Sequence, residues 1–261
     1  MGIVNVTPDS FSDGGRFLSH DAAIAHGLEL VRQGADILDI GGESTRPGSQ
    51  PVPLEEELQR VVPVVAGLAR QSDVVLSIDT SKAEAARACL EAGAHIVNDI
   101  TGLTGDPNMP AVVRDLGAGA ILMHMQGTPA TMQVAPTYDD VVADIGRYFA
   151  DRLQALTSLG ITPEAISLDP GIGFGKTRAH NITLLARLGE FRKFGRPLCL
   201  GVSRKGFLGK LLDRPVEERV AASLAAAAFA LGQDAAQVLR VHDVGPTRDL
   251  AIVWDTLSRQ K

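Results

Sequence analysis

The chain is poor in cysteine, in aromatic residues and in long apolar runs. Of its 261 residues two are cysteines, and aromatic side chains make up 4% of the composition. Cys89 and Cys199 lie far apart in apolar surroundings, which predicts two buried thiols rather than a disulfide or a metal-binding pair. No apolar stretch is both long enough and free enough of charge to span a bilayer. The sequence therefore predicts no membrane partner.

Acidic residues outnumber basic residues, 31 to 25. The net charge is −6, which argues against a protein that binds nucleic acid over its whole surface but leaves room for a local anion site. The six histidines have no spacing typical of zinc ligands. The first residues show no signal-peptide pattern, so we expect a cytoplasmic, reducing compartment.

Eight short apolar runs are the main feature that is present. Each run ends in polar residues and is followed by a helical stretch, and the runs span residues 3–6, 37–40, 74–78, 95–97, 120–123, 166–168, 198–202 and 238–241. Continuous Val/Ile/Leu runs are typical of parallel strands that helices cover. The pattern predicts one domain over residues 1–261 with a (β/α)8 TIM-barrel fold, whose chemistry lies at the carboxyl ends of the strands.

The stretch Asp169–Thr177, DPGIGFGKT, resembles a phosphate-binding loop without matching one. Pro170 stands where a P-loop needs glycine, and the glycine spacing does not fit a dinucleotide fingerprint. The glycines instead indicate a sharp turn or a close approach of the backbone to a ligand. Asp169 is either a ligand contact or a simple turn residue.

Cationic side chains follow the seventh and eighth runs. Lys205 in SRKGFLG is expected to face a ligand, whereas Arg204 is expected to point outward by the alternation of the strand. Arg240 and His242 in RVHDVG share one face, and this end of the fold commonly binds phosphate. A packed core histidine is the alternative for His242.

Asp79 and Asn98 end neighbouring strands of the predicted barrel. A carboxylate and an amide side by side can recognise the donor and acceptor edge of a flat heterocycle, and Asp169 could serve in the same way. His124, after the fifth run, is either a further pocket residue or a packing residue.

Two polar loops, residues 7–17 and 43–53, follow strands and are lid candidates. Asp9 and Asp13 in the first loop are either turn formers or charges that loop closure brings to the site. Thr45 and Arg46 lie at the tip of the second loop. The small-residue run 221–232 indicates close packing against the barrel, with a dimer interface as the alternative.

Taken together, the motifs resemble those of the dihydropteroate synthase family. The segments NVTPDSFSDGG, GGESTRPG, SIDTSK, VNDITG, LDPGIGFGK, SRKGFLG and RVHDV occur in that family's order over essentially the whole chain. The resemblance implies an enzyme of folate biosynthesis that joins p-aminobenzoate to a pterin methyl diphosphate and releases pyrophosphate. It also implies a sulfonamide target that forms homodimers.

The resemblance assigns roles to residues of this chain. The residues implied to bind the pterin are Asp79, Asn98, Asp169 and Lys205. Those implied to bind pyrophosphate are Asn5, Arg240 and His242, with Asn5 also contacting Mg²⁺. Those implied to bind p-aminobenzoate are Phe11, Thr45, Pro47, Phe174, Lys205 and Gly206. Asp9 and Arg46 are loop residues, and Asp13 is placed to face a cationic methylene. The catalytic group is then Lys205, Asp13, Arg240 and His242.

The chain departs from the family pattern in two places. Gly206 stands where the family commonly has serine, and the usual extension before the first strand is missing. Three other functions stay open. They are a methyltetrahydrofolate–corrinoid methyltransferase, a Schiff-base aldolase that uses Lys205, and a pterin-binding protein without catalysis. The last is disfavoured because a pure pterin binder needs no pyrophosphate site.

Overall fold

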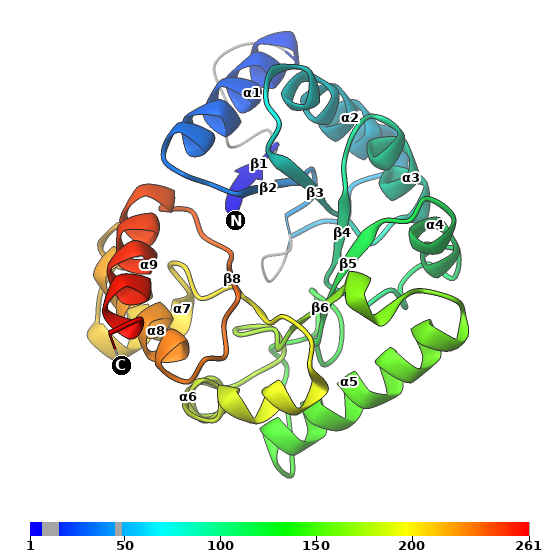
Figure 1. The fold of residues 1–261 in the computed structure, drawn as a ribbon. Coiled ribbons are helices and arrows are strands. Elements are labelled where there is room, and N and C mark those ends of the chain that lie inside the picture. The colour runs from blue at the N-terminus through cyan, green and yellow to red at the C-terminus, as the bar shows by residue number, and fades with distance from the viewer. Residues whose placement is uncertain (7–15, 45–48, 261) are drawn as a thin grey trace.

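A computed structural model describes residues 1–6, 16–44 and 49–260 of the chain. Within these residues, a ring of parallel strands is surrounded by helices (Figure 1). The polar segments that follow the strands are thereby gathered at one end of the ring, because all strands run in the same direction.

Six strands form one parallel sheet in chain order. They are β1 (Gly2–Asn5), β2 (Ile37–Gly41), β3 (Val75–Asp79), β4 (Ile96–Asp99), β5 (Gly119–Met123) and β6 (Ile166–Asp169). The short strands β7 (Cys199–Leu200) and β8 (Val238–Leu239) pair with each other. Single parallel bridges, Leu168 to Leu198 and Gly2 to Val241, join this pair to β6 and to β1. The strands therefore close into a ring, and the predicted barrel is confirmed.

Helices follow the strands and cover the outside of the barrel. They are α1 (Arg16–Arg32), α2 (Leu54–Gln71), α3 (Ala83–Glu91), α4 (Met109–Asp115), α5 (Val141–Ser158), α6 (Arg178–Ala186), α7 (Gly206–Leu212), α8 (Val220–Gly232) and α9 (Val244–Ser258). The described residues also form the short 3-10 helices η2 (Pro163–Ala165), η3 (Leu188–Phe194) and η4 (Val216–Glu218). Among the described residues, no helix is long and apolar enough to cross a membrane.

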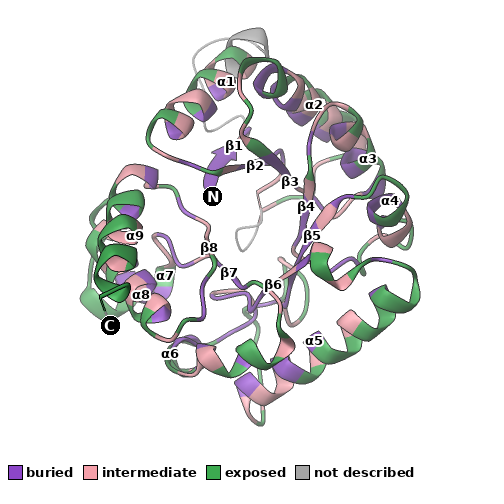
Figure 2. Cartoon of the chain, in the orientation of Figure 1, coloured by how far each residue is buried: buried purple, intermediate pink, exposed green. Residues whose placement is uncertain are grey.

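The main core lies between the strands and the helices. Alternate strand residues such as Leu38, Ile40 and Leu122 are fully buried there, and Figure 2 shows buried strands inside helices whose outer faces are exposed. Cys89 and Cys199 are both buried and free, as expected. Because side chains alternate along a strand, the residues between these core residues face the inside of the barrel.

The inside of the barrel changes from apolar to polar along its axis. A second buried cluster contains Met1, Ile121 and Cys199, with Ile37, Ile96 and Val238 packed against it. Several of these begin their strands, so the cluster lies toward the amino-terminal ends. Further along the same inward faces stand the buried polar residues Asp39, Ser77 and Asn98. The polar end is where a site can form.

Candidate functional site

The strand register aligns three site candidates at the carboxyl ends of nearby strands. Asn5 of β1 pairs with Gly41 of β2, Gly41 with Asp79 of β3, and Asp79 with Asn98 of β4. Parallel strands in register thus bring Asn5, Asp79 and Asn98 to the same level of the barrel mouth. The side chain of Asn5 is half-buried and has no hydrogen-bond partner within the residues the structure describes.

Arg240, directly after β8, reaches across the barrel to two carboxylates. Its Nε donates to Oδ2 of Asp39 over 2.6 Å, and its Nη2 donates to Oδ2 of Asp79 over 2.7 Å. Desolvation raises the pKa of Asp79 to about 7, although the Arg240 charge opposes this rise. The structure therefore brings Arg240 and Asp79 together, two residues that the sequence assigned to neighbouring subsites.

Asp39 was missed by the sequence reasoning. It lies within the apolar strand ILDIG, is fully buried, and accepts a hydrogen bond from Nδ2 of Asn98 over 2.9 Å as well as the bond from Arg240. A charged residue inside an apolar run, at a position that alternation turns inward, is the signal that could have found it.

The glycine-rich loop after β6 is folded back against the barrel. Gly171, Gly173 and Gly175 all have positive φ angles, and a Cβ at Gly171 would lie 2.0 Å from the carbonyl oxygen of His124. Oδ1 of Asp169 accepts a hydrogen bond from the Gly171 amide over 2.7 Å. Asp169 therefore uses this oxygen to stabilise the turn. Desolvation raises the pKa of the Asp169 carboxyl group. The capping box of Thr177 and His180 fixes the far end of the loop at α6.

Lys205 meets this loop from the other side. It precedes α7, and its Nζ lies 4.3 Å from the centroid of the Phe174 ring. Desolvation lowers the pKa of Lys205 to about 8, and the Asp169 carboxylate opposes this shift. The loops after β6 and β7 therefore bring Asp169, Phe174 and Lys205 together. A Cβ at Gly206 would meet nothing within 4 Å, so the family's serine would fit there.

Lys176 anchors the glycine-rich loop, a role that the sequence analysis did not predict. The side chain is buried, and its Nζ donates to the carbonyl oxygens of Phe174 (2.8 Å) and His124 (3.3 Å) and lies 3.2 Å from Nδ1 of His124. Burial lowers the pKa of Lys176 to about 7 and that of His124 to about 3. His124 also packs edge-on against Tyr148, which supports the packing interpretation.

His242 lies exposed beside Arg240, which excludes the core-histidine alternative. Oγ of Ser203 accepts a hydrogen bond from the His242 amide over 3.2 Å and lies 3.1 Å from Nδ1 of the ring. Partial desolvation and the charges of Arg240 and Arg204 lower the pKa of His242 to about 4. Arg204 turns away, as expected, to form a two-pronged ion pair with Asp243.

A partly buried ion cluster holds the base of the second loop. Nζ of Lys82 lies 2.5 Å from a carboxylate oxygen of Glu43 and 2.5 Å from one of the fully buried Glu57 in α2.

The predicted site residues Asp9, Phe11, Asp13, Thr45, Arg46 and Pro47 lie outside the described residues. Within the described part of the chain, no three His, Cys, Asp or Glu side chains are grouped so that they could hold a metal ion.

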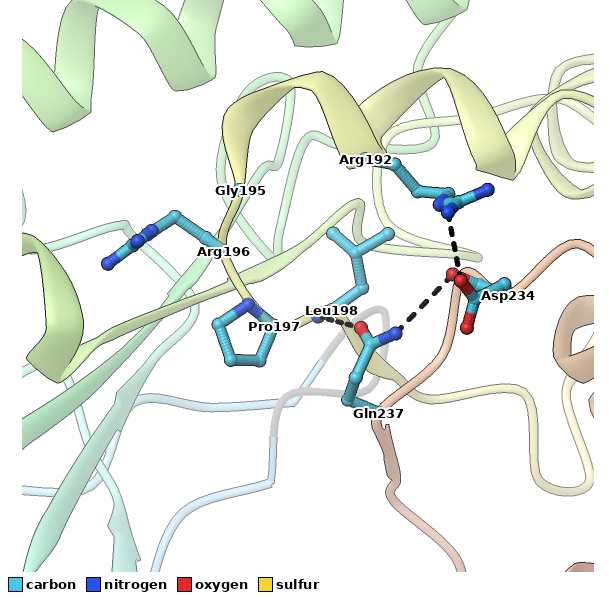
Figure 3. Close-up of a pocket in the computed structure, with 7 residues that line it drawn as sticks. All are labelled: Arg192, Gly195, Arg196, Pro197, Leu198, Asp234 and Gln237. Atoms are coloured by element: carbon cyan, nitrogen blue, oxygen red, sulfur yellow. Dashed lines mark hydrogen bonds and ion pairs between the residues drawn. The ribbon is translucent and has the colours of Figure 1, made fainter. Parts of the chain in front are cut away.

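A hollow of about 280 Å³ lies at the other end of the barrel. Its lining residues include Arg192, Leu198, Asp234 and Gln237, and an ion pair joins Arg192 to Asp234 (Figure 3). These residues precede β7 and β8, whereas the site candidates follow their strands. The hollow is therefore not part of the candidate site.

Known proteins are similar to this chain in sequence and in fold. Residues 1–242 match the family described as pterin binding enzyme. The chain is 49% identical to the dihydropteroate synthase of Escherichia coli strain K12 over 262 residues, which is 100% of this chain and 92% of that protein. A relative from a Synechocystis strain, also named dihydropteroate synthase, is 46% identical over 99% of this chain and 90% of its own length.

Solved structures agree with the sequence comparison. The dihydropteroate synthase of Yersinia pestis in complex with a sulfonamide drug superposes with a TM-score of 0.94 at 46% identity, covering 100% of this chain and 94% of that chain. The Xanthomonas albilineans dihydropteroate synthase in complex with 7,8-dihydropteroate gives a TM-score of 0.89 at 46% identity, over 99% of this chain and 92% of that chain. The same enzyme has also been solved with 4-aminobenzoic acid.

Proposed function

The chain belongs to the dihydropteroate synthase family of pterin binding enzymes, and on this premise we propose that it joins a dihydropterin methyl diphosphate to p-aminobenzoate and releases pyrophosphate. One observation carries the proposal. Hydrogen-bond acceptors that suit a pterin lie at the barrel mouth on Asp79, Asn98 and Asp169. The same mouth contains cationic and neutral hydrogen-bond donors that suit a diphosphate. Neither an aldolase nor a methyltransferase would need both.

The pterin is bound by the polar end of the barrel. Its amino and ring N–H groups are donors that match a carboxylate, which Asp169 supplies with the oxygen that Gly171 does not use. Asn98 supplies its amide oxygen, since its nitrogen already donates to Asp39. Lys205 donates to an acceptor of the ring, and its position over Phe174 fixes the direction of the ammonium.

The diphosphate is bound by Arg240 and His242. Nη1 of Arg240 has no hydrogen-bond partner among the described residues and is free to donate to an anionic oxygen. Ser203 accepts from the His242 amide and can donate its own hydroxyl proton to Nδ1, which leaves the ring proton on Nε2. The neutral imidazole can then donate this proton toward the leaving pyrophosphate.

Asn5 fits a magnesium ion of the kind that keeps most of its ligands as water and phosphate oxygens. Its half-buried amide has no partner among the described residues, and only β2 separates its strand from that of Asp79. Bound Mg²⁺ would supply positive charge that stabilises the departing pyrophosphate. Asp39 and Asp79 each give one carboxylate oxygen to Arg240, so we assign Asn5 as the protein ligand of the ion.

Substitution at the methylene carbon depends mostly on departure of the leaving group, since an arylamine is a weak nucleophile. The C–O bond breaks and its electron pair leaves with pyrophosphate, the amine nitrogen forms the C–N bond, and the acidic arylammonium proton passes to water.

The p-aminobenzoate side is bordered by Phe174, Lys205 and Gly206. Phe11, Thr45 and Pro47 are proposed to complete it, with Asp13 facing the methylene cation and Asp9 and Arg46 on the loops.

The enzyme is also proposed to be a cytoplasmic homodimer that sulfonamides inhibit by occupying the p-aminobenzoate side. Large apolar side chains remain exposed along α7, η4, α8 and α9, namely Leu211, Leu212, Val216, Phe229, Ile252, Val253 and Leu257. The helices α8 and α9 contact each other and together form one outer side of the molecule (Figures 1 and 2). Exposed large apolar side chains on neighbouring helices are typical of subunit interfaces.

Pyrophosphate release tests the proposed function. With the pterin diphosphate and Mg²⁺ present, release should depend on added p-aminobenzoate, and Arg240→Ala should reduce the rate by about 100-fold because a charge-assisted contact to the leaving group is lost. Arg192→Ala, in the hollow at the other end of the barrel, is the matched control and should keep the wild-type rate. Absence of p-aminobenzoate-dependent release from the wild-type enzyme would contradict the proposal.

A further inference from the structure

A carboxylate below the barrel mouth has partners on both sides of the site. Asp39 lies inside β2 with none of its surface exposed, between the outward-facing Leu38 and Ile40. Burying a charge is costly unless that charge is paired and hydrogen-bonded. Asp39 is paired, but through one oxygen only: Oδ2 accepts two hydrogen bonds, while Oδ1 has no partner among the described residues.

The first bond fixes the orientation of the Asn98 amide. Only the nitrogen of an amide can donate to a carboxylate, so the 2.9 Å contact determines which way round the group stands. The amide oxygen of Asn98 is thereby left as an acceptor for a ligand. Without Asp39, the amide could rotate and present its donor instead.

The second bond fixes the plane of the Arg240 guanidinium. Asp39 holds Nε over 2.6 Å and Asp79 holds Nη2 over 2.7 Å, and the two carboxylates come from adjacent strands. A planar group held at two corners cannot swing, so Nη1 keeps one direction. Arg240 also forms an ion pair with Asp39, and this second pairing weakens the electrostatic attraction between Arg240 and Asp79.

We propose that Asp39 is a positioning residue that sets both subsites at once, Asn98 for the pterin and Arg240 for the diphosphate. The proposal rests on the proposed function, and Asp39 itself touches no substrate. It follows that substitution of Asp39 weakens the binding of a pterin and the binding of pyrophosphate together. The affinity for p-aminobenzoate, whose described neighbours are Phe174 and Lys205, should stay unchanged.

Two variants and one control separate positioning from a purely structural role. Asp39→Asn keeps a carbonyl oxygen that can accept both hydrogen bonds but removes the charge, whereas Asp39→Ala removes the acceptor altogether. The control is Ser77→Ala. Ser77 is the register partner of Asp39 on β3, it is equally buried, and its hydroxyl has no partner among the described residues.

Calorimetric titration with 6-hydroxymethylpterin, and separately with pyrophosphate and Mg²⁺, gives the two affinities, and steady-state kinetics give KM and kcat. We expect Asp39→Asn to weaken both affinities about tenfold and Asp39→Ala about 100-fold, because hydrogen bonds to charged groups are stronger than neutral ones. Ser77→Ala should match the wild type. If Asp39→Ala does not fold, the isosteric Asp39→Asn decides the matter alone.

The proposal is overturned if Asp39→Asn, as a folded protein, binds both ligands as Ser77→Ala does, or if only one of the two affinities changes. It is also overturned if KM for p-aminobenzoate rises in parallel with the two affinities, since that indicates general damage to the mouth. These outcomes differ from failure of the proposed function, in which the wild-type enzyme itself releases no pyrophosphate on addition of p-aminobenzoate.

Discussion

At the scale of single residues, the charged groups of the mouth differ in how completely the protein itself satisfies them. Arg240 is held by two carboxylates, whereas Asp169 is held by one backbone amide and Lys205 by an aromatic face. A charge with few protein partners gains most from a ligand. Asp169 and Lys205 are therefore the groups whose pairing should change most when the pterin binds.

The ionisation of Asp79 and Lys205 predicts a narrow pH optimum. The pKa of Asp79 is raised to about 7, and the pKa of Lys205 is lowered to about 8. If the pterin needs an ionised Asp79 and a protonated Lys205, kcat/KM for the pterin diphosphate should rise as pH passes 7 and fall as pH passes 8. A pH series of initial rates measures both limbs.

Variants assign each limb of this profile. Asp79→Asn should remove the acid limb, and Lys205→Arg should remove the alkaline limb because a guanidinium keeps its proton. Both variants will be slower than the wild type. A profile that has the same two limbs in both variants would show that other groups, such as the substrate phosphates, cause them.

Gly171 should tolerate no side chain. Its φ angle is 67°, and a Cβ would lie 2.0 Å from a backbone oxygen of His124. Gly171→Ala should therefore reduce the free energy of unfolding by more than the roughly 1 kcal/mol that a left-handed backbone alone costs a non-glycine residue. Chemical denaturation measures the difference.

Gly117→Ala is the matched control for this substitution. Gly117 has a φ angle of 63°, but a Cβ there would meet nothing within 4 Å. It therefore reports the backbone cost without the clash. Equal losses of stability in the two variants would contradict the close contact between the glycine-rich loop and His124.

At the scale of structural elements, Lys82 joins three of them. It follows β3, and its ammonium contacts Glu43 at the base of the loop after β2 and Glu57 in α2. Glu57 is fully buried, so Lys82 is the charge that balances it. The loop that carries Thr45, Arg46 and Pro47 thus begins from a base fixed to the barrel.

Lys82→Met should destabilise the protein and weaken the binding of p-aminobenzoate. Leaving Glu57 as an unpaired buried charge should reduce the free energy of unfolding by about 3–5 kcal/mol. Loss of the contact with Glu43 should raise KM for p-aminobenzoate more than it changes the affinity for a pterin. Denaturation and steady-state kinetics measure the two effects.

The double variant Glu57→Leu/Lys82→Met separates stability from loop position. An apolar pair in place of a buried ion pair is often neutral or stabilising, so the double variant should recover stability. The KM for p-aminobenzoate should stay high because Glu43 still has no anchor. Recovery of KM together with stability would mean that the cluster does not position the loop.

The sequence predicted the order of the elements better than the pairing of side chains. Strand ends were identifiable because polar tails follow apolar runs, and Asp79, Asn98, Asp169, Lys205 and Arg240 were selected as site candidates in this way. Asp39 was missed because a strand interior is read as core. The Arg240–Asp79 ion pair joins residues 161 positions apart, and nothing local in the sequence specifies such a contact.

The last two strands were also shorter than their apolar runs. The runs 198–202 and 238–241 predicted strands of ordinary length, whereas β7 and β8 have two residues each. Single bridges at Leu198 and Val241 extend the pairing only as far as barrel closure requires. Beyond Leu200 the backbone leaves the ladder before it reaches Lys205, whereas Arg240 lies between the end of β8 and the bridge at Val241.

At the scale of the whole molecule, the exposed apolar surface on α7–α9 predicts a dimer. Phe229→Glu and Val253→Glu would place charges on side chains that are more than half exposed in the single chain but buried in the proposed interface. Sedimentation velocity should show a dimer for the wild type and a shift toward monomer for each variant, because an unpaired interfacial charge is costly to bury.

Leu159→Glu serves as the control for this experiment. Leu159 follows α5, which lies on another side of the barrel from α8 and α9 (Figure 1), and it is also half exposed. The control should sediment like the wild type. A wild-type protein that sediments as a monomer at micromolar concentration would contradict the proposed homodimer.

The proposed reaction requires a single ligand site at the polar end of the barrel, and a crystal structure with a bound pterin and pyrophosphate tests this most directly. We predict the pterin ring against Asp169, Asn98 and Lys205, with pyrophosphate between Arg240, His242 and Asn5. Electron density for the pterin at the opposite end, in the hollow beside Arg192 and Gln237, would contradict the account.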